Sequence, residues 1–159
     1  MSAVLVMIVL AAAPWAGAIA SVEPRPATLE FHLVDEQNNP VQAHQSGEVP
    51  PGDQLYMKRD GTPLLLKRHV VATSDEITRV TVKTTQQGPT VDVRLDARGA
   101  ASMLRTTREN VGHQMAAVYN GQVINRAVIR GTFGRQFQVT GLTAAEAHAL
   151  AMKLHRATQ

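Results

Sequence analysis

The six histidines are the first residues of this sequence that could carry chemistry, because imidazole binds metals and transfers protons near neutral pH. None of them stands in an HExxH or HxH pattern. His148 and His155, seven residues apart in a predicted helix, would lie about 10 Å apart along its axis, which is too far to share one zinc ion. The sequence therefore predicts no metal site and no cofactor.

The nucleophiles and acids give no catalytic pattern either. The chain has no cysteine and no serine in a G-x-S-x-G turn. Ser74, in "ATSDEIT", is interpreted as part of a turn or a helix start. The acidic residues are scattered, and no pair has the spacing of an acid/base couple. We expect a protein that is not an enzyme. The open alternative is an enzyme whose catalytic site is assembled from residues far apart in the sequence.

The basic residues are spread along the chain, and the net charge is only +3. Proteins that bind nucleic acids concentrate such charge and add aromatic side chains for stacking, whereas aromatic residues make up 4% of this sequence. We therefore expect no nucleic-acid partner. Binding to a protein through surface shape is the remaining prediction.

A β-hairpin is the clearest local element. Asn120-Gly121 stands between two strand-like segments in "HQMAAVYNGQVINRAVIRG", and this dipeptide favours the type I′ turn of a two-residue hairpin. The turn sets a register in which Tyr119 faces Gln122, Val118 faces Val123, and Ala117 faces Ile124. Periodicity does not say which face of this hairpin is buried.

Two helices are predicted from apolar spacing. In residues 97–111 the side chains expected on the buried face are Ala97, Ala100, Ala101, Leu104 and Val111, and Gly112 ends the helix. The second helix begins with a capping box of Thr143 and Glu146, and Leu142 is placed to pack on Ala147. Its predicted buried stripe consists of Ala147, Leu150, Ala151 and Leu154.

The other predicted strands follow alternating or β-branched patterns. They cover residues 28–34, a hairpin around Asp60-Gly61, the segments on either side of "QQGP" within 77–95, and residues 137–140. Residues 35–53 are rich in Pro, Gly, Asn and Gln and are expected to form a long exposed loop. The predicted fold class is α+β, with a small, mostly antiparallel sheet and two helices packed on it.

The first 22 residues carry no charged side chain and contain an apolar run followed by Ala18-Ile19-Ala20, a small-x-small site. We expect a signal peptide over residues 1–20 that directs export, with an uncleaved membrane anchor as the alternative. The zero cysteine count excludes disulfides and a lipid anchor on cysteine. The expected organisation is a signal peptide at 1–20, a strand and long loop at 21–54, and an α+β domain at 55–159.

Five stretches together resemble, in order, the first periplasmic region of SecD, an accessory membrane subunit of the bacterial preprotein translocase. They are "RPATLEFHLV", "HVVATSDEITRVTV", "VDVRLDARGA", "TRENVGHQMAAVYNGQVINRAVI" and "VTGLTAAEAHALAMKLHRA". The resemblance implies an α+β head in the periplasm that engages a polypeptide emerging from the translocon. SecD continues into a long membrane domain that this sequence does not show, so no proton-driven activity of its own is expected.

The functional expectation is an exported, stand-alone SecD-like head that binds non-native polypeptide or an export partner such as the Sec translocase. An exposed strand edge would accept an extended chain by β-augmentation. The candidate contact residues are Tyr119, Asn120 and Gln122 at the hairpin and Arg105 and Arg108 on the first helix. The alternatives are a structural or regulatory envelope protein that docks on the translocase, and an exported enzyme. Membrane contact is expected only through an uncleaved leader.

Overall fold

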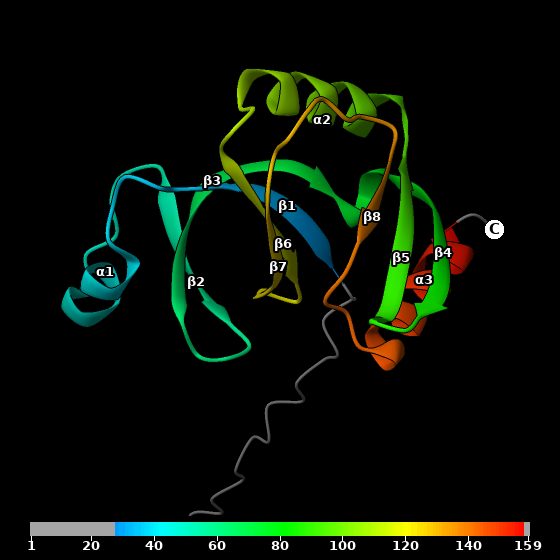
Figure 1. Cartoon of the computed structure of the whole chain (residues 1–159), viewed down its shortest axis with the longest axis horizontal. Helices are drawn as coiled ribbons and strands as arrows, with labels where there is room; N and C mark the ends of the chain where they lie inside the picture. The colour runs from blue at the N-terminus through cyan, green and yellow to red at the C-terminus, as the bar shows by residue number, and fades with distance from the viewer. Residues whose placement is uncertain (1–27, 158–159) are drawn as a thin grey trace, which may run out of the picture.

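The computed structural model describes residues 28–157, and within them two β-structures and three α-helices pack around one main core (Figure 1). The α+β class is confirmed. The predicted signal peptide at residues 1–20 lies outside the described residues. The elements are β1 (Leu29–Val34), α1 (Pro40–Ser46), β2 (Asp53–Lys58), β3 (Pro63–Thr73), a 3₁₀ turn (Ser74–Glu76), β4 (Ile77–Thr85), β5 (Gly88–Leu95), α2 (Ala97–Glu109), β6 (Gln114–Tyr119), β7 (Gln122–Val128), β8 (Gln136–Val139) and α3 (Ala144–Ala157).

Five strands form a closed barrel in the order β1-β3-β2-β7-β6. The strand β1 pairs with both β3 and β6, so residues 29–34 are an integral part of this barrel. The barrel closes through a short parallel contact between β2 and β7, where Met57 pairs with Gln122 and Lys58 with Val123. The division of the chain at residue 54 stays a prediction.

The β6–β7 hairpin turns at Asn120-Gly121, with φ of 50° and 82°, as the sequence predicts. The pairs Tyr119–Gln122 and Val118–Val123 are confirmed. The third predicted pair is wrong, because a bulge between Ala117 and Val118 places Ala117 opposite Asn125 instead of Ile124. The bulge decides which β7 side chains share a face with Ala117.

The segment 35–53 is not a continuous loop, since it contains α1. Asn39 accepts hydrogen bonds from the backbone N–H groups of Val41 and Gln42, Pro40 occupies the first turn, and Gly47 ends the helix at φ 74°. These residues were interpreted as turn formers, and at this spacing they cap a seven-residue helix.

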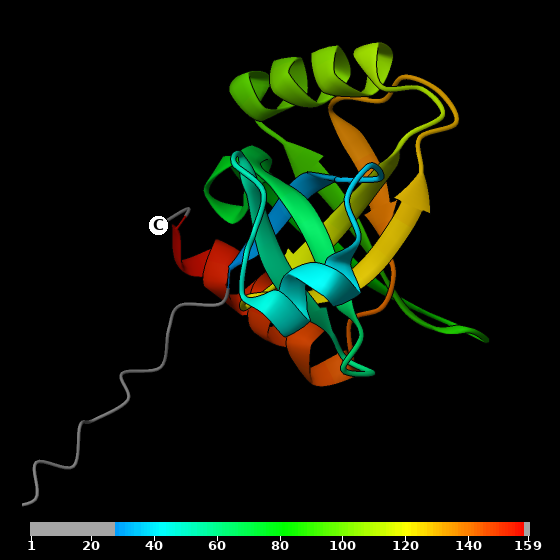
Figure 2. The same cartoon turned by 90° about the vertical axis from the view of Figure 1, so that its left-hand side faces the viewer.

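The second β-structure is a three-stranded antiparallel sheet in the order β4-β5-β8. Its inner face, which includes Val91, Val93 and Leu95, packs against the outer face of the barrel, and the main core lies between them. The helix α3 packs against β4 and, to a smaller extent, β5. In Figure 2, α3 and β8 lie on opposite sides of the molecule, so the core has one helix-covered side and one side bordered by β8.

The range predicted for the first helix is correct to within two residues, but the predicted buried face is wrong. The buried residues of α2 are Gly99, Met103, Thr106 and Thr107, whereas Leu104 and Val111 are 46% and 54% exposed. Thr107 can be buried because its hydroxyl donates to the Met103 carbonyl oxygen at 2.8 Å and accepts from the Phe133 N–H at 3.1 Å. The buried face of α2 thus includes threonines whose hydroxyl groups are hydrogen-bonded, and the spacing of apolar residues does not predict such positions.

The start of α3 is confirmed in detail. The Thr143 N–H donates to the Glu146 carboxylate at 2.7 Å, and the Glu146 N–H donates to the Thr143 hydroxyl at 3.3 Å. Ala147 and Leu150 are fully buried. The side chains of Leu154 and His155 lie outside the described ones. No helix within residues 28–157 combines the length and apolar character needed to cross a membrane.

Candidate functional site

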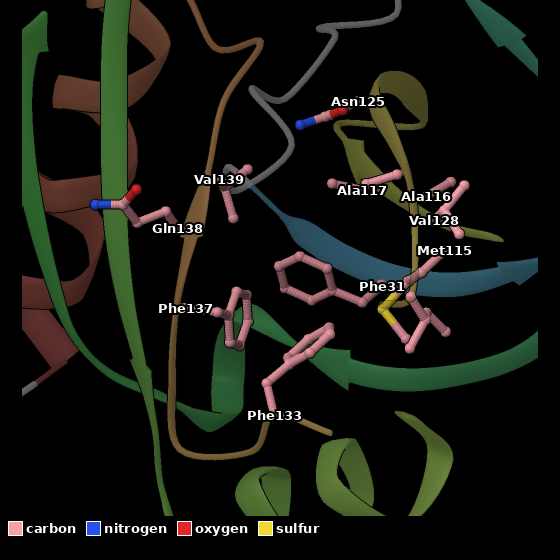
Figure 3. A pocket seen from close by; sticks show the side chains of 12 residues that line it. Phe31, Met115, Ala116, Ala117, Asn125, Val128, Phe133, Phe137, Gln138 and Val139 are labelled. Carbon is pink, nitrogen blue, oxygen red and sulfur yellow. The ribbon is translucent and has the colours of Figure 1, made fainter. Parts of the chain in front are cut away.

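A pocket of about 240 Å³ opens between β7 and β8, and β6 and β1 form its floor (Figure 3). Twelve side chains from four strands and the β7–β8 loop line it, and ten of them are apolar. The apolar ones are Phe31, Met115, Ala116, Ala117, Ala127, Val128, Ile129, Phe133, Phe137 and Val139. We name this space the β7–β8 groove.

The three phenylalanines of the whole chain meet at this groove. Phe31 and Phe137 are in edge-to-face contact with ring centroids 5.0 Å apart, and Phe133 lies 5.7 Å from Phe137 (Figure 3). Phe133 and Phe137 are only partly buried. Phe133 and Phe137 therefore present apolar surface to whatever enters the groove, and the buried Phe31 ring packs against Phe137.

Both ends of the groove are fixed by polar contacts. At one end the Asn125 side-chain amide donates to the Thr140 hydroxyl at 2.7 Å. Next to it, Gly141 has φ 92°, and a Cβ there would collide with the Ile124 carbonyl oxygen. At the other end Thr107 binds the backbone of Phe133. Hydrogen bonds therefore fix the groove walls at its two ends, and the pocket lies between them.

The strand β8 has one hydrogen-bonded neighbour, β5, among the described strands. The Leu95 N–H donates to the Arg135 carbonyl oxygen at 2.8 Å, and opposing residues of an antiparallel pair alternate between bonded and non-bonded. From this alternation, the backbone groups of Gln136 and Gln138 point away from β5. This free edge borders the β7–β8 groove and could accept a further strand.

The structure places the predicted site residues in two separate regions. Asn120 and Gln122 are exposed at the hairpin tip, whereas Tyr119 is 6% exposed and packs in the main core. Arg105 and Arg108 are exposed on α2, at the opposite end of β6 and β7 (Figure 1). Their role in binding a partner stays a prediction, and a single contact surface does not include both groups.

The groove residues were not found from the sequence. The sequence predicts only that Phe31 lies on the buried face of a strand and that Phe133 and Phe137 lie in a loop and a short strand. Phe31 and Phe133 stand about a hundred positions apart, and nothing in local spacing brings them together. One feature of the sequence could have pointed to the groove: two of the three phenylalanines stand four residues apart in "TFGRQF".

A buried polar cluster inside the barrel is a second feature that could carry chemistry. The Lys67 ammonium lies 3.1 Å from Asp35 and 2.9 Å from Asp53, and both carboxylates are almost fully buried. Burial raises the pKa of Asp35, but hydrogen bonds from Asn38, Gln37 and Lys67 outweigh burial and lower it to about 2. His32, 1% exposed, binds the Lys67 carbonyl oxygen at 2.8 Å.

This cluster links the segment after β1 to β2 and β3, and its side chains bind one another. Within residues 28–157 no group of three or more histidine, aspartate or glutamate side chains is arranged to hold a metal ion. Ser74 receives a hydrogen bond from Lys153 at 3.4 Å, yet Ser74 is 2% exposed in the 3₁₀ turn. The turn interpretation of Ser74 is confirmed, and its burial keeps it from contacting a substrate in this conformation.

Comparisons with known proteins agree with the resemblance noted in the sequence. Residues 53–158 match the family model described as SecDF, P1 head subdomain. The protein translocase subunit SecD of Escherichia coli K12 is 33% identical, with 73% of this chain and 22% of that protein covered. SecD of Haemophilus influenzae is also 33% identical, with 80% of this chain and 24% of that protein covered. The chain therefore spans about a quarter or less of the length of these curated relatives.

Solved structures give the same result. A structure of SecDF, described as a membrane component that enhances protein export, superimposes with a TM-score of 0.57 at 25% identity. That match covers 81% of this chain and 62% of the other. SecDF in its super-membrane-facing form gives the same TM-score and identity, with 18% of that chain covered. The chain belongs to the SecDF P1 head subdomain family.

Proposed function

We propose that this protein is a periplasmic SecD-type head that binds non-native polypeptide in extended form, along the free edge of β8 and over the β7–β8 groove. The single observation that supports this most strongly is the position of the three phenylalanines beside an unpaired strand edge. The proposal assigns the chain no reaction. It also assigns residues 1–20 the role of an export signal.

The groove suits an extended chain for two physical reasons. Backbone hydrogen bonds to a strand edge depend little on sequence, so they serve a protein that meets many clients. An apolar pocket beside that edge adds affinity for one large side chain at a time. The groove measures about 240 Å³, and an apolar cavity of about 150 Å³ already holds a benzene ring.

Membership of the family connects this binding to protein export. The relatives are named as translocase subunits, and we propose that this chain acts with the Sec translocase on polypeptides that emerge from it. A head of this kind would hold a client by its backbone while the client is still unfolded. A folded client offers few free backbone groups and should be released.

A proline at the free edge tests the proposal. Gln138→Pro removes an N–H that points away from β5, so the substitution removes no hydrogen bond of the sheet itself. We expect this variant to bind a reduced, unfolded polypeptide at least about tenfold more weakly, because the added strand loses a backbone donor and meets the pyrrolidine ring. Fluorescence anisotropy with a labelled client measures the affinity.

Gln138→Thr is the matched control, because it changes the same side chain and keeps the N–H. It should bind the client as the original protein does. Circular dichroism and thermal unfolding of both variants confirm that β8 has formed. Equal binding by the proline and threonine variants, with both folded, would refute β-augmentation at β8.

A second candidate function is docking on the translocase through α2. Its exposed side carries Leu104, Arg105 and Arg108, and Val111 is exposed just beyond the end of the helix, so this surface is apolar and basic. In this case Leu104→Ser should weaken binding to the assembled translocase and leave binding of the unfolded client unchanged. Pull-down with purified translocase separates the two functions.

A further inference from the structure

Most of the β7–β8 groove is built from one stretch of the chain that contains basic residues and no acidic residues. From Asn110 to Ala145 the chain contains no aspartate and no glutamate. This stretch supplies β6, β7, the β7–β8 loop and β8, and it contains Arg126, Arg130 and Arg135. All three arginines are exposed, and none has an acidic partner among residues 28–157.

Two of these arginines adjoin the groove directly. Arg130 follows Ile129, and Arg135 stands between Phe133 and Phe137, so each is within two positions of a lining residue. Both arginines are exposed, and by their position in the chain they flank the Phe133 end of the groove.

The acids that other elements bring near these walls are either paired with a basic group or outnumbered by basic residues. Asp92, opposite Gln138 in the sheet, is paired with Lys83 at 2.5 Å. Glu30, beside Phe31, contacts His32 at 3.3 Å. Glu109 on α2 is exposed, and Arg105 and Arg108 on the same helix exceed its charge. The groove region thus keeps an unneutralised positive charge.

Resting on the function proposed above, we propose that the preferred occupant of the groove is an extended peptide with a large apolar side chain flanked by aspartate or glutamate. The apolar side chain fills the pocket at the three phenylalanine rings. The flanking carboxylates pair with Arg130 and Arg135 at its end. The backbone pairs with the free edge of β8, as for any client.

The positive charge also disfavours a second copy of this chain as the occupant of the groove. Pairing two β8 edges would extend the sheet but would bring together two copies of the same arginine-bearing surface. Like charges across such a seam disfavour association, and basic residues at a sheet edge commonly prevent edge-to-edge pairing. The same charge attracts an acidic peptide.

Three labelled ten-residue peptides test the preference against the intact chain. The first has a central phenylalanine flanked by aspartate and glutamate, the second has lysine at the flanks, and the third is the acidic peptide with serine in place of phenylalanine. We expect the acidic phenylalanine peptide to bind about fivefold or more tightly than the lysine peptide, because each exposed ion pair adds a modest term. The difference should shrink in 1 M salt, where the Debye length is about 3 Å.

The double variant Arg130→Gln/Arg135→Gln should remove the preference for acidic flanks and retain binding of the phenylalanine side chain. The matched control is Arg79→Gln/Arg94→Gln, which removes the same charge from the outer face of the three-stranded sheet and should keep the preference. Equal affinity for acidic and lysine flanks would overturn this inference and leave the proposed function standing. Failure of all three peptides and of the unfolded client to bind would overturn the proposed function itself.

Discussion

The main core of this protein has two sides that differ in how they end. Along β4 the space between barrel and sheet is filled by α3, whose Ala147 and Leu150 are fully buried. Along β8 no helix completes the core within the described residues, Val128 is 46% exposed, and Phe133 and Phe137 are only partly buried. The sheet is therefore closed at one margin and open at the other (Figure 2).

This difference between the two sides indicates which one stabilises the fold and which one is free to bind a ligand. A helix over the β4 side removes apolar surface from water and stabilises the fold. The β8 side leaves comparable surface and a row of backbone groups in solvent, although proteins usually cover or shorten such edges. We conclude that the open margin is available for a ligand and that its exposed side chains contribute less to folding than those packed under α3.

Truncating one apolar side chain on each side gives the largest expected contrast. Leu150→Ala on the closed side should lower the free energy of unfolding by about 3 kcal/mol, because it leaves a cavity in a packed core. Val128→Ala on the open side should change it by less than about 0.5 kcal/mol. Urea denaturation midpoints measure both, and equal losses would contradict the comparison.

Acid should weaken the barrel and spare the groove. The folded pKa of Asp35 is about 2, below the ordinary 3.8, so its carboxylate stabilises the fold above pH about 4. The contribution, about 2 kcal/mol, is lost as pH falls from about 4 to about 2. Asp35→Asn should flatten this part of the pH profile of unfolding free energy. An unchanged profile in the variant would show that Asp35 is not the group responsible.

Two threonines give a smaller contrast between the same two sides. Thr143→Ala removes the capping box of α3 and should cost about 1 kcal/mol of unfolding free energy. Thr140→Ala removes only the exposed hydrogen bond with Asn125 at the end of the groove and should cost about 0.5 kcal/mol. Thermal unfolding ranks the two variants. A larger loss at Thr140 would show that the open side is held more tightly than we infer.

Local signals in the sequence predicted the elements well. Asn120-Gly121 gave the hairpin turn and its first two residue pairs, and Thr143 with Glu146 gave the start of α3. These features depend on residues within four positions of one another. The bulge between Ala117 and Val118 was not predicted, because the residues of the hairpin carry no local signal for it.

The features that need distant contacts were missed. Thr107 is buried on α2 because Phe133, 26 positions later, binds its hydroxyl. The groove exists because the chain brings Phe31 next to Phe137 across two β-structures. Apolar periodicity contains neither kind of information. The family resemblance, by contrast, was carried by the order of whole blocks and was confirmed.

Hydrogen exchange at the β8 backbone tests the central claim most directly. Addition of a saturating unfolded client or acidic phenylalanine peptide should slow exchange of the Gln136 and Gln138 amides, which point away from β5. Exchange of the Asn120 amide at the hairpin tip, which donates to the Thr28 carbonyl oxygen, should stay unchanged. Bound peptide with unprotected Gln136 and Gln138 amides would contradict the account.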